Sequence, residues 1–293
     1  MSDSATPVTQ VEGTFRASDG FELHTYTWSS REIDARPGPT VVFMHGYAEH
    51  VGRYREFAEQ LVRAGNRVSG FDARGHGKTP GQRGHIDDFE RYVEDLHEYT
   101  QWIRHKAPEQ PLILLGHSNG GLASLRLAQS RRHVLDGLIL SSPLIALQPK
   151  HQVVPMWLAI IIDALASRLP LPNGIDGSEL THDPEIRRLQ ENDPLGHGRT
   201  TPRWFVTVNQ TMVRAMANLE SVRLPLLVLQ ADSDPIVVPQ AITHMFQRIA
   251  SPDKELIVVR DSYHELLNEV GRHETYRQIA SWLGKRWKAS AAA

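Results

Sequence analysis

Short apolar runs alternate with longer segments of helical periodicity along most of this 293-residue chain. The runs are rich in β-branched residues and end in polar or glycine-containing loops, as strands buried on both faces of a sheet do. Such runs occur at residues 40–44, 66–72, 111–115, 135–142, 225–230 and 255–260. Helical patterns occur at residues 88–107, 121–131, 239–249 and 275–287. Together they predict an α/β fold with a mostly parallel central sheet flanked by helices.

The N-terminal strands are expected to be antiparallel. Residues 12–28 alternate apolar and polar positions on both sides of Asp19-Gly20, a dipeptide typical of tight hairpin turns. This pattern predicts a hairpin that extends one edge of the sheet.

Residues 144–222 interrupt the alternation of strands and helices. They show no clear strand, only helix-like segments separated by Pro and Gly. A connection of this length inside a compact domain is usually functional. We expect residues 144–222 to form an inserted helical cap above the carboxyl ends of the strands, where α/β sheets bind ligands. Residues 1–143 and 223–293 would then form the core.

The first helix expected in this insertion, at residues 153–169, is unusually apolar. Two interpretations are open. Its apolar face packs on the main domain, or it forms an exposed apolar rim that admits acyl chains or touches lipid surfaces.

Composition excludes several classes of function. The formal charge of −2, without blocks of like charge, gives no indication of nucleic-acid binding. The absence of cysteine excludes disulfides, thiolate catalysis and cysteine-ligated zinc. No apolar run is long enough to span a bilayer, and the N-terminal residues do not resemble a signal peptide. We expect a cytoplasmic protein, with peripheral membrane contact as the alternative that the apolar rim would allow.

The sequence LGHSNGG at residues 115–121 points to nucleophilic catalysis. Its G-x-S-x-G pattern follows a predicted buried strand and precedes a predicted helix, which is the setting of a nucleophile elbow. Ser118 would occupy the strained turn, and a side chain at Gly116 or Gly120 would collide with neighbouring backbone. We therefore expect Ser118 to be the nucleophile.

A serine nucleophile needs a base and an acid that orients it, and in this fold class they follow in the order Ser, Asp or Glu, His. His264 begins the loop that leaves the last predicted strand, so it is the expected base. The preceding strand is followed by Asp232 and Asp234. Asp234 is favoured because it lies further into the loop, before Pro235, and Asp232 is the alternative.

An oxyanion hole requires backbone donors. We expect the N–H groups of Asn119, directly after the nucleophile, and of Tyr47, in the loop after residues 40–44. Gly46 would allow close approach of that loop, and the Tyr47 side chain is expected to be structural or to line the pocket. The nearby residues His45, Glu49 and His50 resemble metal ligands by composition, but their H-x-x-x-E-H spacing matches neither zincins nor inverzincins, so no metal or other cofactor is expected.

The motifs together resemble the α/β-hydrolase superfamily, and within it the monoacylglycerol lipase and lysophospholipase branch of serine hydrolases. They include HGYAEHVGRY at residues 45–54, GHGKTPGQRGHI at residues 75–86, LGHSNGG, NDPLGHG at residues 192–198, LQADSDPIV and YHELLNE at residues 263–269. The resemblance implies Ser118, Asp234 and His264 as the triad and the N–H groups of Tyr47 and Asn119 as the oxyanion hole. It also implies a cap with an acyl tunnel and a lid that can touch membranes.

One position departs from this family, whose members commonly have Met where this chain has Asn119.

The expected activity is hydrolysis of lipid-like monoesters, most simply monoacylglycerols. Lysophospholipase and general carboxylesterase activity are alternatives that use the same triad. Acyl transfer and ligand binding without catalysis are further ones.

Overall fold

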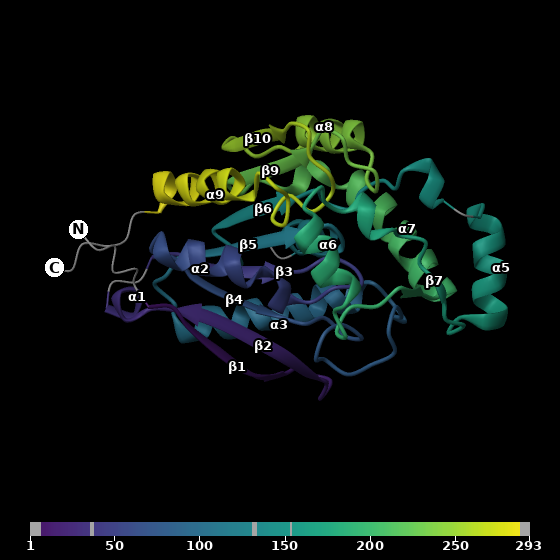
Figure 1. Cartoon of the computed structure of the whole chain (residues 1–293), viewed down its shortest axis with the longest axis horizontal. Helices are drawn as coiled ribbons and strands as arrows, with labels where there is room; N and C mark the ends of the chain where they lie inside the picture. The colour runs from purple at the N-terminus through teal and green to yellow at the C-terminus, as the bar shows by residue number, and fades with distance from the viewer. Residues whose placement is uncertain (1–6, 36–37, 131–133, 153, 288–293) are drawn as a thin grey trace.

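The computed structural model describes residues 7–35, 38–130, 134–152 and 154–287 (Figure 1). Its strands are β1 (Thr9–Arg16), β2 (Glu22–Ser29), β3 (Thr40–Met44), β4 (Arg67–Phe71), β5 (Leu112–His117), β6 (Gly137–Ser141), β7 (Leu171–Pro172), β8 (Arg199–Thr200), β9 (Leu226–Ala231) and β10 (Lys254–Val259). Its helices are α1 (Arg31–Ala35), α2 (Arg55–Arg63), α3 (Glu90–Lys106), α4 (Asn119–Ser130), α5 (Met156–Ala166), α6 (Pro184–Glu191), α7 (Pro202–Ala217), α8 (Pro239–Arg248) and α9 (Arg272–Arg286).

The central sheet has eight strands in the order β1-β2-β4-β3-β5-β6-β9-β10. All neighbours from β4 to β10 pair in parallel, whereas β1 pairs with β2 and β2 with β4 in antiparallel register. The N-terminal hairpin therefore lies at one edge, as its alternating pattern predicts. Its turn contains Gly20 at φ 85°, in the left-handed region that favours glycine.

Two apolar layers cover the two faces of the sheet. One contains buried side chains from α2 and α9, and the other contains side chains from α3, α4, α7 and α8. Strands β3, β5, β6 and β9 are buried along their whole length, which explains their continuously apolar sequences. The predicted α/β fold is confirmed, although α2 was not predicted from the sequence pattern.

Residues 144–222, here called the inserted segment, contain α5, α6 and α7. Their described part adds no strand to the large sheet, but β7 and β8 form a two-residue antiparallel pairing that the sequence pattern did not predict. Helix α5 packs against α7 and lies at one end of the molecule (Figure 1). Within the described ranges, no helix combines the length and the apolar character that crossing a membrane requires.

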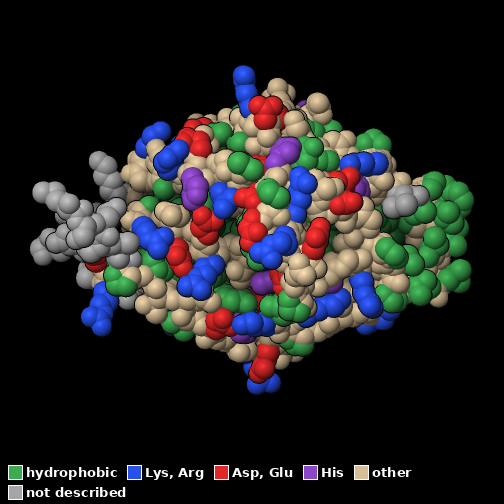
Figure 2. Space-filling model, in the orientation of Figure 1, with side chains coloured by type: hydrophobic (Ala, Val, Ile, Leu, Met, Phe, Trp, Pro, Cys, Tyr) green, Lys and Arg blue, Asp and Glu red, His purple; other side chains and the backbone are tan. Residues whose placement is uncertain are grey.

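Helix α5 corresponds to the apolar helix expected at residues 153–169, of which Val153 lies outside the described residues. Only Ala159 and Asp163 are buried in α5, whereas Trp157, Ile160, Ile161 and Leu165 are exposed. Figure 2 shows hydrophobic side chains gathered at the same end of the molecule. The structure therefore favours the exposed apolar rim over packing on the main domain.

Candidate active site

A sharp turn between β5 and α4 presents Ser118. The residue has φ 50°, a left-handed conformation that is strained for a residue with a Cβ atom. A Cβ atom added to Gly116 would lie 2.4 Å from the carbonyl oxygen of Gly120, and one added to Gly120 would lie 2.2 Å from that of Met44. Both glycines are therefore required by close backbone approach, as the sequence motif predicts.

The structure brings the three predicted triad residues together. Nε2 of His264 lies 2.8 Å from Oγ of Ser118, and Nδ1 lies 2.8 Å from Oδ2 of Asp234. The other carboxylate oxygen of Asp234 accepts hydrogen bonds from the N–H groups of Ile236 at 2.8 Å and Val237 at 2.9 Å. These contacts form one continuous chain of hydrogen bonds from Ser118 to Asp234.

The alternative acid, Asp232, is exposed and accepts a hydrogen bond from the hydroxyl of Ser233. It directly follows β9, and within the described part of the chain its carboxylate forms no hydrogen bond with His264. Of the two aspartates that the sequence left open, Asp234 is the one that meets the imidazole.

Burial and charge act against each other in the triad. Burial is the largest single effect on His264 and lowers its pKa. The charge and hydrogen bond of Asp234, together with the charges of Glu265 and Glu49, outweigh burial, so the pKa lies above its ordinary value of 6.5. Burial raises the pKa of Asp234, but the His264 imidazolium and the donated hydrogen bonds outweigh this effect and lower it. The environment therefore favours an ionised aspartate beside an imidazole that readily accepts a proton.

The two predicted oxyanion donors follow the neighbouring strands β5 and β3 of the sheet. Asn119 is the first residue of α4, so its N–H is one of the first four that have no acceptor within the helix. Tyr47 lies in the loop after β3 and lines the same cavity as Ser118. The N–H of Gly46 donates to Oε1 of Glu49 at 2.5 Å, which fixes the start of that loop. The donor roles themselves remain a prediction.

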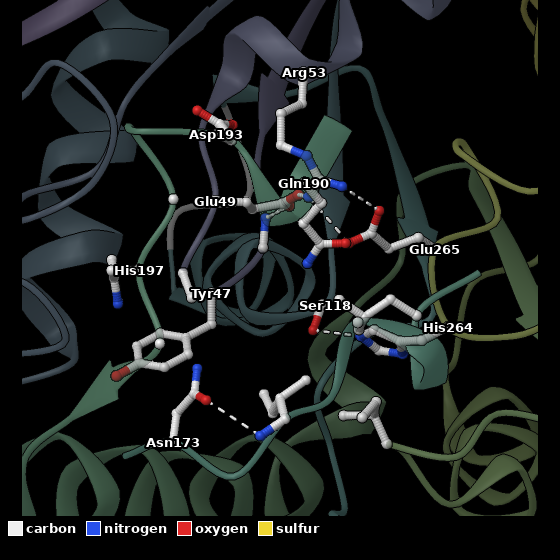
Figure 3. Close-up of a pocket in the computed structure, with 18 of the residues that line it drawn as sticks. Tyr47, Glu49, Arg53, Ser118, Asn173, Gln190, Asp193, His197, His264 and Glu265 are labelled. Atoms are coloured by element: carbon white, nitrogen blue, oxygen red, sulfur yellow. Dashed lines mark hydrogen bonds and ion pairs between the residues drawn. The ribbon is translucent and has the colours of Figure 1, made fainter. Parts of the chain in front are cut away.

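A cavity of about 320 Å³ lies over Ser118 and His264 (Figure 3). Residues of the core and of the inserted segment both line it. Its apolar lining comes from Tyr47, Ala48, Ile175, Leu180 and Ile236, and its polar lining from Glu49, Arg53, His117, Asn173, Gln190, Glu191, Asp193, His197 and Glu265. Asn119 is not among these residues. Its side chain is buried, and Oδ1 has no hydrogen-bond partner within the described ranges.

The sequence analysis missed a buried ionic network in the cavity wall. Arg53 donates to Oε2 of Glu49 at 2.5 Å and forms a bidentate pair with Glu265, at 3.0 and 2.8 Å. Burial raises the pKa of Glu49 to about 7. Burial also acts to raise the pKa of Glu265, but the charge and hydrogen bonds of Arg53, with smaller contributions from His117 and Asn268, together outweigh burial and lower it. The available signals were the spacing of four between Glu49 and Arg53 and the position of Glu265 directly after His264.

The side chains that resembled metal ligands make separate contacts. Nε2 of His45 accepts a hydrogen bond from the N–H of Ala73 at 2.9 Å. His50 pairs with Asp193 of the inserted segment at 2.8 Å, and Glu49 belongs to the ionic network. Each group is therefore engaged with its own partner.

Known proteins resemble this chain over most of its length. The family model described as serine aminopeptidase, S33 matches residues 35–271. A monoacylglycerol lipase of Mycolicibacterium smegmatis is 31% identical over 94% of this chain and 97% of its own length. Phospholipase YtpA of Bacillus subtilis is 31% identical over 86% of this chain and 96% of its own. The crystal structure of a Paleococcus ferrophilus monoacylglycerol lipase superposes with a TM-score of 0.79 at 30% identity, covering 90% of this chain and 98% of that one.

Proposed function

Because this chain belongs to the serine aminopeptidase S33 family of α/β hydrolases, we propose that it hydrolyses carboxylic esters of lipid-like monoesters, with monoacylglycerol as the substrate. The observation that carries the proposal is the unbroken chain of hydrogen bonds from Ser118 through His264 to Asp234 beneath the cavity. A serine with such a base and acid is the arrangement that acyl transfer needs.

In the proposed reaction, Oγ of Ser118 attacks the ester carbonyl carbon while Nε2 of His264 takes the hydroxyl proton. The bond between the carbonyl carbon and the glycerol oxygen then breaks, and His264 donates the proton to the leaving glycerol. A water molecule, deprotonated by His264, then attacks the carbonyl carbon of the acyl-enzyme. The bond between that carbon and Oγ of Ser118 breaks, His264 returns the proton to Oγ, and the fatty acid is released. Asp234 holds the imidazole in the required tautomer and stabilises its charged form.

The negative charge that develops on the carbonyl oxygen needs donors that are already in place. We assign this role to the N–H groups of Tyr47 and Asn119. The N-terminus of α4, which begins at Asn119, adds the positive end of the helix dipole at the same point.

The charges of the cavity wall favour a neutral head group over a phosphate. Arg53 is the only Lys or Arg among the described residues that line the cavity, and it is already paired with Glu49 and Glu265. Glu191 and Asp193 add two more carboxylates to the lining. A lysophospholipid phosphate would be repelled by these groups and would find no free cation, whereas glycerol hydroxyls can hydrogen-bond to carboxylates. Lysophospholipase activity is therefore the weaker alternative.

We assign the inserted segment the role of a cap whose outer surface contacts lipid. The exposed apolar side chains of α5 lie at the end of the molecule where hydrophobic side chains gather on the surface (Figure 2). Such surfaces bind the interfacial region of a bilayer through buried apolar area. Contact of this kind would present the cavity to monoesters dissolved in a membrane.

A hydrolysis panel tests the proposed function. Its substrates are monoacylglycerols of short and long chain, lysophosphatidylglycerol of matched chain length, whose head group is anionic, and short nitrophenyl esters, with Ser118→Ala as the blank. We expect kcat/KM for the monoacylglycerols to exceed that for lysophosphatidylglycerol by at least about 10-fold, since an unfavourable charge contact of about 1.4 kcal/mol corresponds to that factor. Turnover of the short soluble esters alone would replace the lipid proposal with a general esterase.

A further inference from the structure

The side chain of Tyr47 points away from the reaction and into the inserted segment. Its hydroxyl lies 2.8 Å from the carbonyl oxygen of Arg199, to which it donates, and 3.2 Å from that of Gly84. Its ring stacks on Trp204, with centroids 3.8 Å apart and an interplanar angle of 29°. The edge of the ring also meets His197, with centroids 5.4 Å apart. One aromatic side chain therefore contacts three residues of the inserted segment.

The backbone beside Tyr47 is held by the same part of the inserted segment. The carbonyl of Ala48 accepts a hydrogen bond from the N–H of His197 at 3.1 Å, and His50 pairs with Asp193. Ala48 has φ 66°, a left-handed conformation that is strained for alanine. Strained backbone of this kind persists only where the surrounding contacts hold it in place.

The core and the inserted segment are closely packed where Gly84 meets Arg199 and Tyr47. Gly84 has φ 71°, and a Cβ atom there would lie 2.3 Å from the carbonyl oxygen of Arg199 and 2.9 Å from the hydroxyl of Tyr47. Tyr47 and Gly84 of the core are therefore packed against Arg199 of the inserted segment with no space for an additional side-chain atom at Gly84.

On the core side, the loop that contains Tyr47 is held by the buried carboxylate of Glu49. The N–H of Gly46 donates to Glu49, which is itself fixed by Arg53 and by the hydroxyl of Tyr54. The N–H of Tyr47 thus lies between an anchor in the core and an anchor in the inserted segment. An oxyanion donor must lie within a few tenths of an ångström of the position in which it binds the oxyanion. The contacts on both sides therefore determine whether the Tyr47 N–H can act as a donor.

We propose that the Tyr47 side chain is a positioning residue that couples docking of the inserted segment to formation of the oxyanion hole. When residues 193–204 are docked, their contacts with the ring and hydroxyl of Tyr47 hold the backbone N–H of the same residue in place. When they move away, the hole loses one of its two donors. This inference rests on the proposed function, because it assumes that the Tyr47 N–H stabilises an ester-derived oxyanion.

The coupling is tested by variants that change the side chain and keep the backbone N–H. Tyr47→Phe removes the hydroxyl bond and keeps the stacked ring, Tyr47→Leu removes both, and Trp204→Leu removes the partner from the inserted segment. Trp204 is not among the residues that line the cavity, so its effect cannot come from substrate contact as the cavity stands. The matched control is Tyr99→Phe, because the hydroxyl of Tyr99 is buried against Ser69, at 2.6 Å, on the sheet.

We expect kcat for a short soluble ester to fall about 3-fold to 10-fold in Tyr47→Phe and about 10-fold to 100-fold in Tyr47→Leu, with KM changed less than about 3-fold. Affinity for a trifluoromethyl ketone, which mimics the tetrahedral intermediate, should fall by the same factors. Trp204→Leu should lower kcat in the same way, and the double variant with Tyr47→Leu should be no worse than the poorer single variant. Tyr99→Phe should retain wild-type kcat.

A kcat for Tyr47→Leu within 3-fold of Tyr99→Phe, or a loss that appears in KM alone, would overturn the inference. If thermal melting shows that Tyr47→Leu does not fold, Tyr47→Phe and Trp204→Leu decide by the same criterion. A wild-type protein that hydrolyses no ester would overturn the proposed function, and this inference with it. An active wild type with unaffected variants overturns the inference alone.

Discussion

Oδ2 of Asp234 lies 2.8 Å from Nδ1 of His264, and Oδ1 of the same carboxylate accepts hydrogen bonds from two backbone N–H groups. This arrangement fixes the carboxylate before it meets the imidazole, so that Nδ1 of His264 carries the proton and Nε2 faces Ser118. Asp232, only two residues away, has no such environment.

The two aspartates should therefore differ sharply when each is changed to asparagine. Asp234→Asn is expected to lower kcat by about 10⁴-fold, because the amide favours the wrong imidazole tautomer. Asp232→Asn, the matched control, should stay within about 2-fold of wild type, as surface substitutions away from special features usually do. Steady-state kinetics on a soluble ester measure both. A large loss in Asp232→Asn together with an active Asp234→Asn would show that the acid is misassigned.

The pH dependence of kcat/KM should report His264. The imidazole must be neutral to accept the serine proton, and the carboxylate of Asp234 raises its pKa above 6.5. Activity should therefore be lost as the pH falls through a midpoint above 6.5. Changing Asp234 to Asn should move the midpoint down, whereas Glu49→Gln should move it much less, since Glu49 contributes least among the causes of the shift. A wild-type midpoint below 6.5 would contradict this explanation.

The Arg53 network should matter more to stability than any surface pair. Arg53→Met leaves the carboxylates of Glu49 and Glu265 buried without their cation, which is expected to cost about 3–5 kcal/mol in the free energy of unfolding. Arg277→Met breaks the pair with Glu274, whose two side chains are 74% and 58% exposed, and should cost less than about 1 kcal/mol. Urea unfolding of both variants gives the comparison, and equal losses would show that the network is not a stabilising unit.

Much of the fold was predictable because its signals are local. The strands β3, β5, β6 and β9 are buried on both faces, so their sequences are apolar without interruption. The elbow glycines could be recognised because backbone crowding allows no other residue at these positions. The two-residue strands β7 and β8 are too short to produce any periodicity.

The contacts that complete the site join distant parts of the chain and leave no local pattern. Arg53 meets Glu265 across 212 positions, and Tyr47 meets Arg199 across 152. Sequence spacing alone also left Asp232 beside Asp234, because the choice depends on how the loop after β9 turns toward His264. Position in the fold, rather than residue type, decides each of these cases.

The apolar surface of α5 should bind lipid without taking part in the chemistry. Trp157 is 65% and Leu165 83% exposed, so changing both to Ser should weaken binding to phosphatidylcholine vesicles by at least about 10-fold. Turnover of a soluble ester should not change. Val270→Ser, at an exposed position outside the inserted segment, is the control. Vesicle co-sedimentation measures binding, and an unchanged double variant would exclude α5 as the contact.

Covalent labelling of the nucleophile tests the central claim most directly. A fluorophosphonate probe reacts with a serine only where a base activates it and the oxyanion donors are in place. Incubation of the wild-type protein followed by peptide mass spectrometry should find one modified residue, Ser118, and Ser118→Ala should remain unlabelled under the same conditions. Labelling of another residue in both proteins, or no labelling of the folded wild type, would contradict the proposal that this chain is a serine hydrolase acting through Ser118.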